Sequence, residues 1–462
     1  MFSSYSVAHY IVFMGAFLFM IISGVIIQIL VFHRFSKVPG PSLGKVTNLY
    51  SAWHSWRGTM YLDIQRYHQR YGDKIRYSPN QILSFQPPDM TAIYAHGKLF
   101  RKSKGYVTML PLLDGWSTMT SIDKTLHRNL RRVFRAGVTA ENLVRYEPAI
   151  LRNLMVYFSQ LTRTKYDEGR STAADMRGWT LHTHEKKMGL WEQLPILNDL
   201  GTSKFVGWVL PLLYPKADQF ASWFQSFLGK AHANNATQSN GIFGPVIQSG
   251  HENLEKPGNN WANMIGEGAF STFSSADAYG MMISGFLHYL SHYPRVYERL
   301  SGESLVYLHA VIDEVMRLLP PVCGVHWREC ERNDIVIGEA QINVPVGTDV
   351  GMSVFTLFRD SRICCNPVCF WPERWIEVTL PEKEQLLART MFAPFSIGPR
   401  NCAGAYVTIM IASIAYVYIL VNYDFRLGRN EQETAPHVGS NTPDEIGSDK
   451  ELVFESHYSI AS

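Results

Sequence analysis

One cysteine lies in a short stretch that combines loop-forming residues with a positive charge, directly before a long apolar segment. The stretch is residues 395–404, with the sequence FSIGPRNCAG. Its two glycines allow backbone turns that a Cβ would obstruct, and Arg400 adds positive charge. Cys402 would then lie at the start of a helix beginning around Ala403, where free N–H groups and the helix dipole favour a thiolate. A thiolate of lowered pKa in a closed apolar pocket suits a soft metal ligand, and an axial thiolate on haem iron is one case.

Two other groups of charged residues lie on predicted helices. Apolar residues recur at helical spacing over 305–319. On that helix Glu314 and Arg317 are three residues apart and therefore neighbours. As an exposed ion pair they would contribute only about 0–1 kcal/mol. A basic helix is predicted over 125–134, with His127 and Arg131 on one face; taken alone, it is typical of a solvated surface.

The composition limits the classes of protein to which the chain can belong. Its 462 residues include 46% apolar side chains, enough for a sizeable core, and its net charge of +3 argues against a nucleic-acid-binding protein. Six cysteines in a chain of this length do not make a disulfide framework. We therefore expect reduced thiols facing the cytosol. The sequence also has no Walker-type loop and no Gly-x-Ser-x-Gly elbow, which removes the common nucleotide-binding and hydrolase interpretations.

The first 32 residues contain no Lys, Arg, Asp or Glu, and residues 11–32 form an almost unbroken apolar run. A helix of about 20 such residues spans a bilayer core. A signal peptide fits less well, because no basic residue precedes the run and the run is too long. His33, Arg34 and Lys37 follow it, and positive charge on that flank places the rest of the chain on the cytoplasmic side. The pattern predicts one transmembrane anchor.

The pattern Phe-x-x-Gly-x-Arg-x-Cys-x-Gly resembles the cysteine-loop signature of the haem-thiolate monooxygenases, the cytochrome P-450 superfamily. Its five fixed positions make a structural cysteine, the usual role of a lone cysteine, the weaker interpretation. The resemblance covers nearly the whole chain and is to the fungal microsomal type. It implies a mainly α-helical fold with small β-sheets, haem b (iron-protoporphyrin IX) as cofactor and Cys402 as the iron ligand. The residues at the five positions are Phe395, Gly398, Arg400, Cys402 and Gly404.

The resemblance also implies roles for the charged residues. Glu314, Arg317 and Arg374, the last in a Pro-Glu-Arg-aromatic motif, would form one buried network that supports the haem site from behind. His127, Arg131 and Arg328 would hold the haem propionates. The neighbouring Arg128 and Arg132 would face a reductase.

A long helix predicted over 266–293 corresponds to the family's distal helix, whose oxygen-activation motif is small-Gly-x-acid-Thr-Thr. The acid is present as Asp277, but Ala278 replaces the first threonine and Ser275 stands where glycine is usual. That hydroxyl normally helps to deliver protons, and alanine cannot donate one. Water or a substrate hydroxyl could replace it, the enzyme could release peroxide, or its chemistry could be atypical.

The remaining elements follow from local patterns. We expect a helix ending at 71–72, two short strands around a turn at 79–80, a hairpin over 335–347, a buried helix over 403–420 and a strand at 452–454. Residues 165–260 would form the lid over the substrate. Compared with the family, the chain is shortened between 177 and 190 and between 300 and 307, by nature or by a gene-model error. The expected organisation is an anchor (1–32, transmembrane about 11–32), a proline-rich hinge (33–45) and a haem-thiolate catalytic domain (46–462).

These observations predict a monooxygenase of the endoplasmic reticulum membrane that inserts one oxygen atom from O2 into a hydrophobic small molecule. Electrons would come from NADPH through a separate flavoprotein reductase, since no flavin or nicotinamide motif is present. Resemblance to filamentous-fungal members suggests secondary-metabolite biosynthesis. Two alternatives stay open. The first is a haem-thiolate isomerase, dehydratase or peroxide-using enzyme, and the second is a shortened, non-catalytic paralogue that binds lipid or protein partners.

Overall fold

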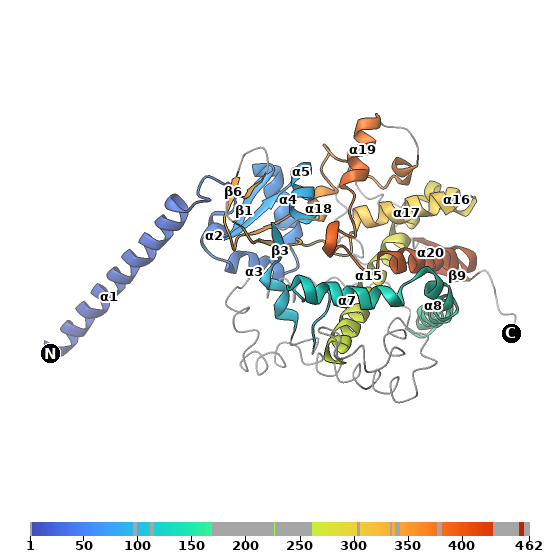
Figure 1. The fold of residues 1–462 in the computed structure, drawn as a ribbon, viewed down its shortest axis with the longest axis horizontal. Helices are drawn as coiled ribbons and strands as arrows, with labels where there is room; N and C mark the ends of the chain where they lie inside the picture. The colour runs from blue at the N-terminus through green and yellow to red at the C-terminus, as the bar shows by residue number, and fades with distance from the viewer. Residues whose placement is uncertain are drawn as a thin grey trace.

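The computed structural model describes residues 2–95, 99–110, 115–168, 226, 261–302, 305–332, 335–337, 342–376, 381–427 and 452–456. This part of the chain is mostly helical with three small β-sheets, which confirms the predicted balance of secondary structure (Figure 1). Most of the predicted substrate lid, including the short stretch at 177–190, lies outside the described residues.

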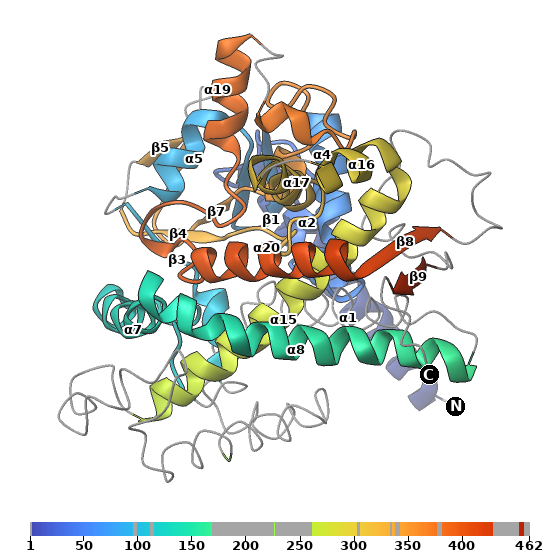
Figure 2. The ribbon, with the colours of Figure 1, turned by 90° about the vertical axis from the view of Figure 1, so that its right-hand side faces the viewer.

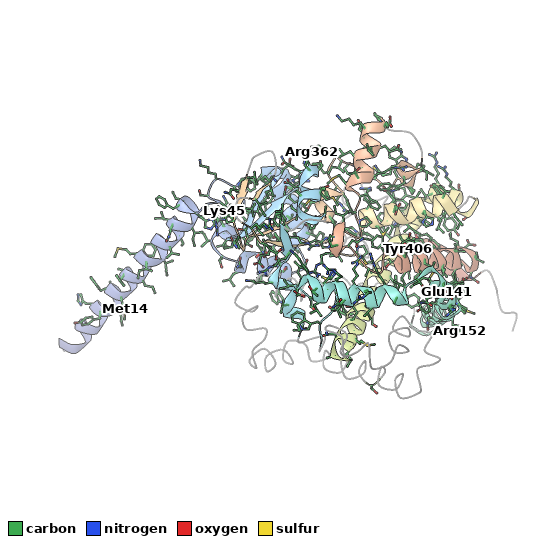
Figure 3. All side chains as sticks on the ribbon, in the orientation of Figure 1. Met14, Lys45, Glu141, Arg152, Arg362 and Tyr406 are labelled. Carbon is green, nitrogen blue, oxygen red and sulfur yellow. The ribbon has the colours of Figure 1, made fainter. Side chains whose placement is uncertain are left out.

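Helix α1 (Phe2–Ile27) continues into a short π-helical segment, η1 (Gln28–Phe32), and projects away from the body of the protein (Figure 1). Residues His9–Phe32 have a mean hydropathy of 2.5 and are long and apolar enough to cross a membrane. Met14, labelled in Figure 3, is 68% exposed. A signal sequence would meet the same criteria, so the anchor stays a prediction.

The hinge after α1 packs against the first sheet. Arg76 N–H donates to the Pro39 carbonyl oxygen at 2.7 Å. A Cβ at Gly40 would lie 2.1 Å from the Arg76 carbonyl oxygen, so the close approach needs glycine. Three short helices lead on from the hinge: α2 (Ser42–Val46), α3 (Leu49–Trp56) and α4 (Met60–Tyr71).

The largest described sheet joins distant parts of the chain. Its strand order is β1-β2-β7-β4-β3, with β2 and β7 parallel and the other pairs antiparallel. Arg101 faces Glu329 across β3 and β4, and their side chains form an ion pair at 2.8 Å. The strands are β1 (Lys74–Ser78), β2 (Gln81–Ser84), β3 (Phe100–Lys102), β4 (Arg328–Cys330) and β7 (Asp349–Gly351).

The other described strands form two sheets of two strands each. β5 (Ile335–Ile337) pairs with β6 (Ile342–Val344), and β8 (Tyr423–Leu427) pairs with β9 (Leu452–Ser456). The remaining helical elements are α5 (Pro87–Tyr94), η2 (Lys104–Met109), α7 (Lys124–Gly137), α8 (Ala140–Glu168), α15 (Trp261–His292), α16 (Pro294–Gly302), α17 (Leu305–Leu318), α18 (Val354–Leu357), η4 (Pro372–Trp375), α19 (Glu382–Met391), η5 (Gly398–Arg400) and α20 (Ala405–Asn422).

The main apolar core lies where α8, α15, α17 and α20 pack together. Figure 2 shows α8 and α20 running side by side, with α15 crossing them. Phe286 of α15 stacks on Tyr416 of α20, with ring centroids 3.7 Å apart. The Tyr416 hydroxyl donates to the Met282 carbonyl oxygen at 2.8 Å. These contacts fix α15 against the helix that follows the cysteine loop.

Helix α20 differs from its prediction in two respects. It begins at Ala405 rather than Ala403, and only 28% of its residues are buried, although it was expected to be buried all round. Tyr406, labelled in Figure 3, is 83% exposed. Its apolar composition was a poor guide to burial, because only the face toward α8, α15 and α17 is covered. The same composition, with a mean hydropathy of 1.8, makes it the second helix able to span a membrane by length and hydropathy among the described residues.

Candidate functional site

The cysteine loop turns back on itself between α19 and α20. Gly398 has φ +76°, and a Cβ there would lie 2.0 Å from the Tyr94 carbonyl oxygen at the end of α5. Glycine is therefore required both by backbone conformation and by space. The Cys402 N–H donates to the Phe395 carbonyl oxygen at 2.8 Å and closes the loop.

Part of Cys402 is open to solvent, while protein atoms pack around much of its sulfur. The pKa of the thiol lies above its ordinary value. Protein atoms that crowd around the sulfur displace water, and this effect outweighs the lowering by the Gly404 N–H and by the charge of Arg131. The expected lowering of the pKa is therefore wrong, since desolvation exceeds the help from the helix start. A metal ion bound by this sulfur must displace its proton.

Arg400 and Arg131 both hold the cysteine loop through hydrogen bonds. Arg400 donates to the carbonyl oxygens of Ser121 at 2.6 Å and Ile122 at 2.9 Å, so it braces the loop against the segment before α7. Arg131 of α7 instead donates to both the backbone and side-chain oxygens of Asn401, the residue directly before Cys402. The positive charge that acts on the sulfur is thus that of Arg131.

Glu314 lies at the centre of a buried ion-paired network. Its carboxylate lies 2.8 Å from Arg317 Nη2 and 3.2 Å from Arg374 Nε, and all three side chains are almost inaccessible to solvent. It also accepts from the Trp371 N–H at 2.9 Å and from Trp375 Nε1 at 3.0 Å. Burial alone would raise the pKa of Glu314, but Arg317 and Arg374 hold it below its ordinary value. The structure thus brings together the three charged residues that the sequence singled out.

This network, named here the Glu314 network (Glu314, Arg317, Arg374), connects the helices with the cysteine loop. Arg317 donates to the carbonyl oxygens of Phe358 at 2.9 Å and Cys369 at 3.0 Å. The Trp375 ring lies 4.5 Å from the ring of Phe392, just before the cysteine loop. Holding these segments requires both arginines to stay paired with Glu314.

His127 lies in a concentration of positive charge. It is buried, and the pKa of its ring is lowered to about 3 by burial and by the charges of Arg400, Lys102, Arg131 and Arg328. Within the described residues, the hydrogen bonds of the three arginines go to carbonyl and amide oxygens rather than to carboxylates. Positive charge gathered in this way suits an anionic group.

Comparison with known proteins indicates the family of the chain. The sequence profile of the cytochrome P-450 family matches residues 281–444. The chain is 28% identical to the cytochrome P-450 monooxygenase AKT7 of Alternaria alternata over 88% of this chain and 87% of that protein. It is also 28% identical to the cytochrome P-450 monooxygenase atnE of Emericella nidulans, over 88% and 89%. Averantin hydroxylase of Dothistroma septosporum is 24% identical over 92% and 87%.

The family profile and these relatives support the cytochrome P-450 superfamily as the family of this chain. Its enzyme class is that of the cytochrome P-450 monooxygenases, and the family implies a haem-thiolate cofactor. The residues of this cytochrome P-450 fit such a group. Cys402 offers a soft sulfur donor that solvent can reach, and the basic residues around His127 suit the anionic propionates. The contacts of individual residues with haem stay predictions.

The residues that the sequence matched to the family's oxygen-activation motif lie on α15. Ala278 is half-buried there, and the side chain of Asp277 is outside the described residues. Tyr279 occupies the second threonine position of that motif and was not among the predicted site residues. Burial raises the pKa of its phenol to about 12, with smaller influences from Thr408 of α20 and from Cys402. The motif spacing was the signal that could have identified it.

Glu267 joins α15 to the segment before α7, a second contact that the sequence did not predict. Its carboxylate accepts from both the backbone N–H and the hydroxyl of Thr118, the latter at 2.8 Å. Beside it, a Cβ at Gly266 would lie 2.4 Å from the Gly115 carbonyl oxygen, so the two backbones touch. Because 149 residues separate Glu267 from Thr118, no local pattern could indicate the pair.

Glu267 is expected to make stability fall as pH rises from about 4.5 to about 7. Burial raises its pKa from 4.5 to about 7, against the opposing hydrogen bonds of Thr118 and the charges of Lys102 and Arg131. In that window the unfolded chain ionises the carboxyl while the folded protein keeps it protonated, so a contribution present at low pH is lost. Glu267→Gln should remove this loss. The difference in free energy of unfolding between Glu267→Gln and the wild type should therefore grow by about 2–3 kcal/mol as the pH rises through this window. Chemical denaturation at several pH values measures this difference. If the free energies of unfolding of the two proteins change with pH in parallel, the prediction is wrong.

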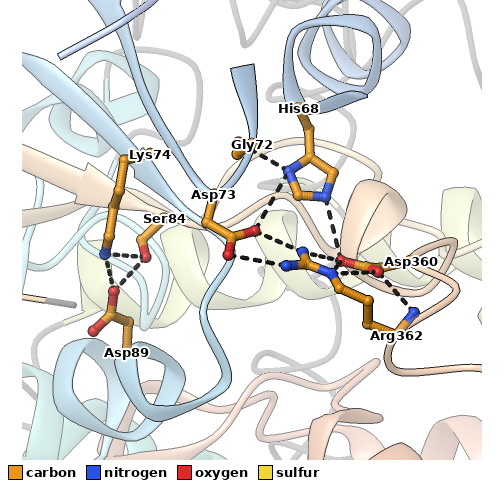
Figure 4. A network of polar contacts seen from close by, with 8 residues as sticks. All are labelled: His68, Gly72, Asp73, Lys74, Ser84, Asp89, Asp360 and Arg362. Atoms are coloured by element: carbon orange, nitrogen blue, oxygen red, sulfur yellow. Dashed lines mark hydrogen bonds and ion pairs between the residues drawn. The ribbon is translucent and has the colours of Figure 1, made fainter. Parts of the chain in front are cut away.

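One group of described side chains, His68, Asp73 and Asp360, is close enough together to hold a metal ion. Figure 4 shows that a guanidinium already lies between the two carboxylates. Arg362 Nη2 donates to Asp73 Oδ1 at 2.6 Å, and Arg362 Nε to Asp360 Oδ1 at 3.0 Å. His68 Nε2 lies 3.3 Å from Asp360 Oδ2. The acids are neutralised by Arg362, so we interpret the group as an ion-paired link between α4 and the segment after α18.

Proposed function

We propose that this cytochrome P-450 is a membrane-anchored haem-thiolate monooxygenase that inserts one oxygen atom from O2 into a hydrophobic small molecule. The proposal includes the cytochrome P-450 fold behind one transmembrane helix, with the anchor in 1–32, the hinge in 33–45 and the catalytic domain in 46–462. The observation that carries it is the pairing of the Cys402 loop with the basic residues around His127. A sulfur donor beside an anion-binding cluster, joined by the hydrogen bonds of Arg131 to Asn401, is what a haem with two propionates requires.

Haem b bound through the Cys402 thiolate would supply oxygen activation, since the thiolate favours cleavage of the O–O bond. The surrounding residues hold and orient the group. Gly398 and Gly404 shape the loop, and the Phe395 carbonyl oxygen fixes the Cys402 backbone. The Glu314 network holds the segments behind the loop in place.

We assign the propionates to His127, Arg131 and Arg328, with Arg400 adding charge from the loop. The pKa of about 3 keeps His127 neutral at working pH, so it would act as a hydrogen-bond partner rather than as a cation. Arg131 and Arg328 then supply the charge. The division of labour follows from burial, because a further buried cation beside the arginines would be costly.

Membrane attachment and electron supply complete the proposal. The exposed apolar helix at His9–Phe32 supports a single-pass anchor, with the catalytic domain on the cytoplasmic side of the endoplasmic reticulum. Electrons would come from NADPH through a separate flavoprotein reductase. The similarity to averantin hydroxylase and to other fungal monooxygenases supports a role in secondary-metabolite biosynthesis.

One observation favours a second candidate function. Ala278 lacks the hydroxyl that the family's motif places on α15, so the protein could use the same haem as an isomerase, a dehydratase or a peroxide-using enzyme. Such an enzyme would convert substrate without consuming NADPH. Asp277 would still provide an acid on this helix in either case.

The purified full-length protein, reconstituted with a fungal reductase and a panel of hydrophobic small molecules, separates these functions. Monooxygenation predicts substrate-dependent NADPH consumption with one oxygen atom from labelled O2 in the product. Product formed without NADPH, or with peroxide alone, would favour the second candidate. Purified protein that binds no haem would favour the shortened, non-catalytic paralogue, and transcript sequencing across 177–190 and 300–307 would test that reading independently.

A further inference from the structure

Tyr94, the last residue of α5, touches both the cysteine loop and the side chain of Arg328. Tyr94 and Arg328 are each 5% exposed, so they meet inside the protein. The guanidinium carbon of Arg328 lies over the Tyr94 ring, 5.0 Å from its centroid. That distance is within the range of a cation–π interaction, and burial strengthens the attraction because little water competes for the cation.

The other contacts of Arg328 do little to hold its charge in place. Within the described residues, its hydrogen bond goes from Nη1 to the Trp327 carbonyl oxygen at 3.1 Å. Arg400 is close enough for repulsion, since burial and then the charge of Arg328 lower the pKa of the Arg400 guanidinium. A buried cation without a counter-charge is costly. The negative face of the Tyr94 ring offsets part of this cost.

The Tyr94 ring is itself fixed by its neighbours. Its hydroxyl oxygen accepts from the Met352 N–H at 2.8 Å. His326 meets the ring edge-on, with centroids 6.5 Å apart and planes at 90°. The Tyr94 carbonyl oxygen lies 2.0 Å from the place that a Cβ at Gly398 would take, so the turn of the cysteine loop rests on this residue. Tyr94 therefore contacts the loop through its backbone and Arg328 through its ring.

We propose that Tyr94 is a positioning residue for haem binding: its ring holds the Arg328 guanidinium where a propionate can bind it, and its backbone supports the cysteine loop at Gly398. The inference rests on the proposed function, in which Arg328 binds a propionate and the loop supplies the iron ligand. A guanidinium that is already in place loses less freedom when it pairs with a carboxylate. One residue thus connects the propionate side of the site with the ligand side.

A second arginine over an aromatic ring provides a matched control. The guanidinium carbon of Arg359 lies 3.7 Å from the centroid of the Phe355 ring, and Arg359 donates to the Leu318 carbonyl oxygen. Phe355 is 1% exposed, as deeply buried as Tyr94, and has no part in the proposed haem site. Phe355→Leu removes a ring from an arginine just as Tyr94→Leu does. A purely structural role would make the two variants behave alike.

The test measures the rate of haem loss to apomyoglobin, the reduction potential and the thermal stability of the haem-loaded, full-length protein. Tyr94→Leu should speed haem loss about ten-fold. It should also lower the potential, because positive charge held near the haem favours the reduced state. In an Arg328→Leu background, Tyr94→Leu should change neither quantity further. Phe355→Leu should lower thermal stability while the potential stays at the wild-type value.

Tyr94→Phe separates the ring from the hydroxyl. It leaves the Met352 N–H without its acceptor, so thermal stability should fall, while haem loss and potential should stay close to the wild type. Fluorine atoms added stepwise to a phenylalanine at position 94 then weaken the negative face of the ring and leave its shape nearly unchanged. Haem loss should quicken with each fluorine, and this trend should disappear in the Arg328→Leu background. The series keeps the ring, so it tests the inference even where Tyr94→Leu does not fold.

The inference is overturned if haem loss does not respond to fluorination, if Tyr94→Leu and Phe355→Leu shift the potential equally, or if the effects of Tyr94→Leu and Arg328→Leu add in full. A wild-type protein that lacks the ~450 nm carbon monoxide band would instead overturn the proposed function itself. A wild type with the band, whose Tyr94 variants all keep haem equally well, would overturn only the positioning role.

Discussion

Glu314→Gln is expected to lower the free energy of unfolding by about 3–5 kcal/mol, enough to leave much of the protein unfolded or free of haem. Glutamine has almost the same shape as glutamate, but it removes the charge that two fully buried guanidiniums share. Its NH2 group would also face donors, because Trp371 N–H and Trp375 Nε1 now point at the carboxylate. Two cations without a counter-charge in the interior are costly.

Glu373→Gln is the matched control. Its carboxylate pairs with Arg299 at 3.0 Å and accepts from the Tyr307 hydroxyl at 2.9 Å, but it lies nearer the surface. We expect this variant to cost only about 0–1 kcal/mol. Chemical denaturation and the haem-to-protein ratio of both variants measure the difference. Equal losses would mean that the buried network contributes no more than a surface pair.

Gly398→Ala is expected to have the second large effect, a loss of at least about 3 kcal/mol in the free energy of unfolding together with loss of haem. Alanine at φ +76° carries the cost of a left-handed conformation, and its Cβ would lie 2.0 Å from the Tyr94 carbonyl oxygen. That oxygen belongs to the backbone at the end of α5. Relief would therefore require the cysteine loop or α5 to move.

Gly347→Ala separates the two parts of that cost. Gly347 has φ +80°, but no atom lies within 4 Å of the position its Cβ would take. We expect it to lose only the conformational cost, about 1–2 kcal/mol, and to keep its haem. Unfolding curves and haem content of the two variants should differ accordingly. A Gly398→Ala protein as stable as Gly347→Ala would show that the contact with Tyr94 is not a constraint.

The sequence predicted those features that depend on local spacing. Helical periodicity predicted α17, and the three-residue spacing of Glu314 and Arg317 put them on one face; the family motif then supplied Arg374 as their partner. The cysteine loop was likewise recognisable from five fixed positions. In each case a few neighbouring residues carry the whole signal.

The features that the sequence could not predict depend on long-range contacts. The partners Thr118 and Glu267 are 149 residues apart, and Phe286 stacks on Tyr416 only because α15 crosses α20. The pKa of the Cys402 thiol was predicted in the wrong direction, because the sequence reveals a helix start but not the desolvation around the sulfur. The exposure of Tyr406 was missed for a similar reason: apolar composition does not tell which side of a helix is covered.

The central claim is that the Cys402 sulfur is the ligand of a haem iron, and one spectrum tests it most directly. The carbon monoxide difference spectrum of the reduced, purified full-length protein should have an intense band near ~450 nm, and Cys402→Ser should lack it. A wild-type protein without the band, or a Cys402→Ser protein that keeps it, would contradict the assignment of this sulfur as the axial ligand.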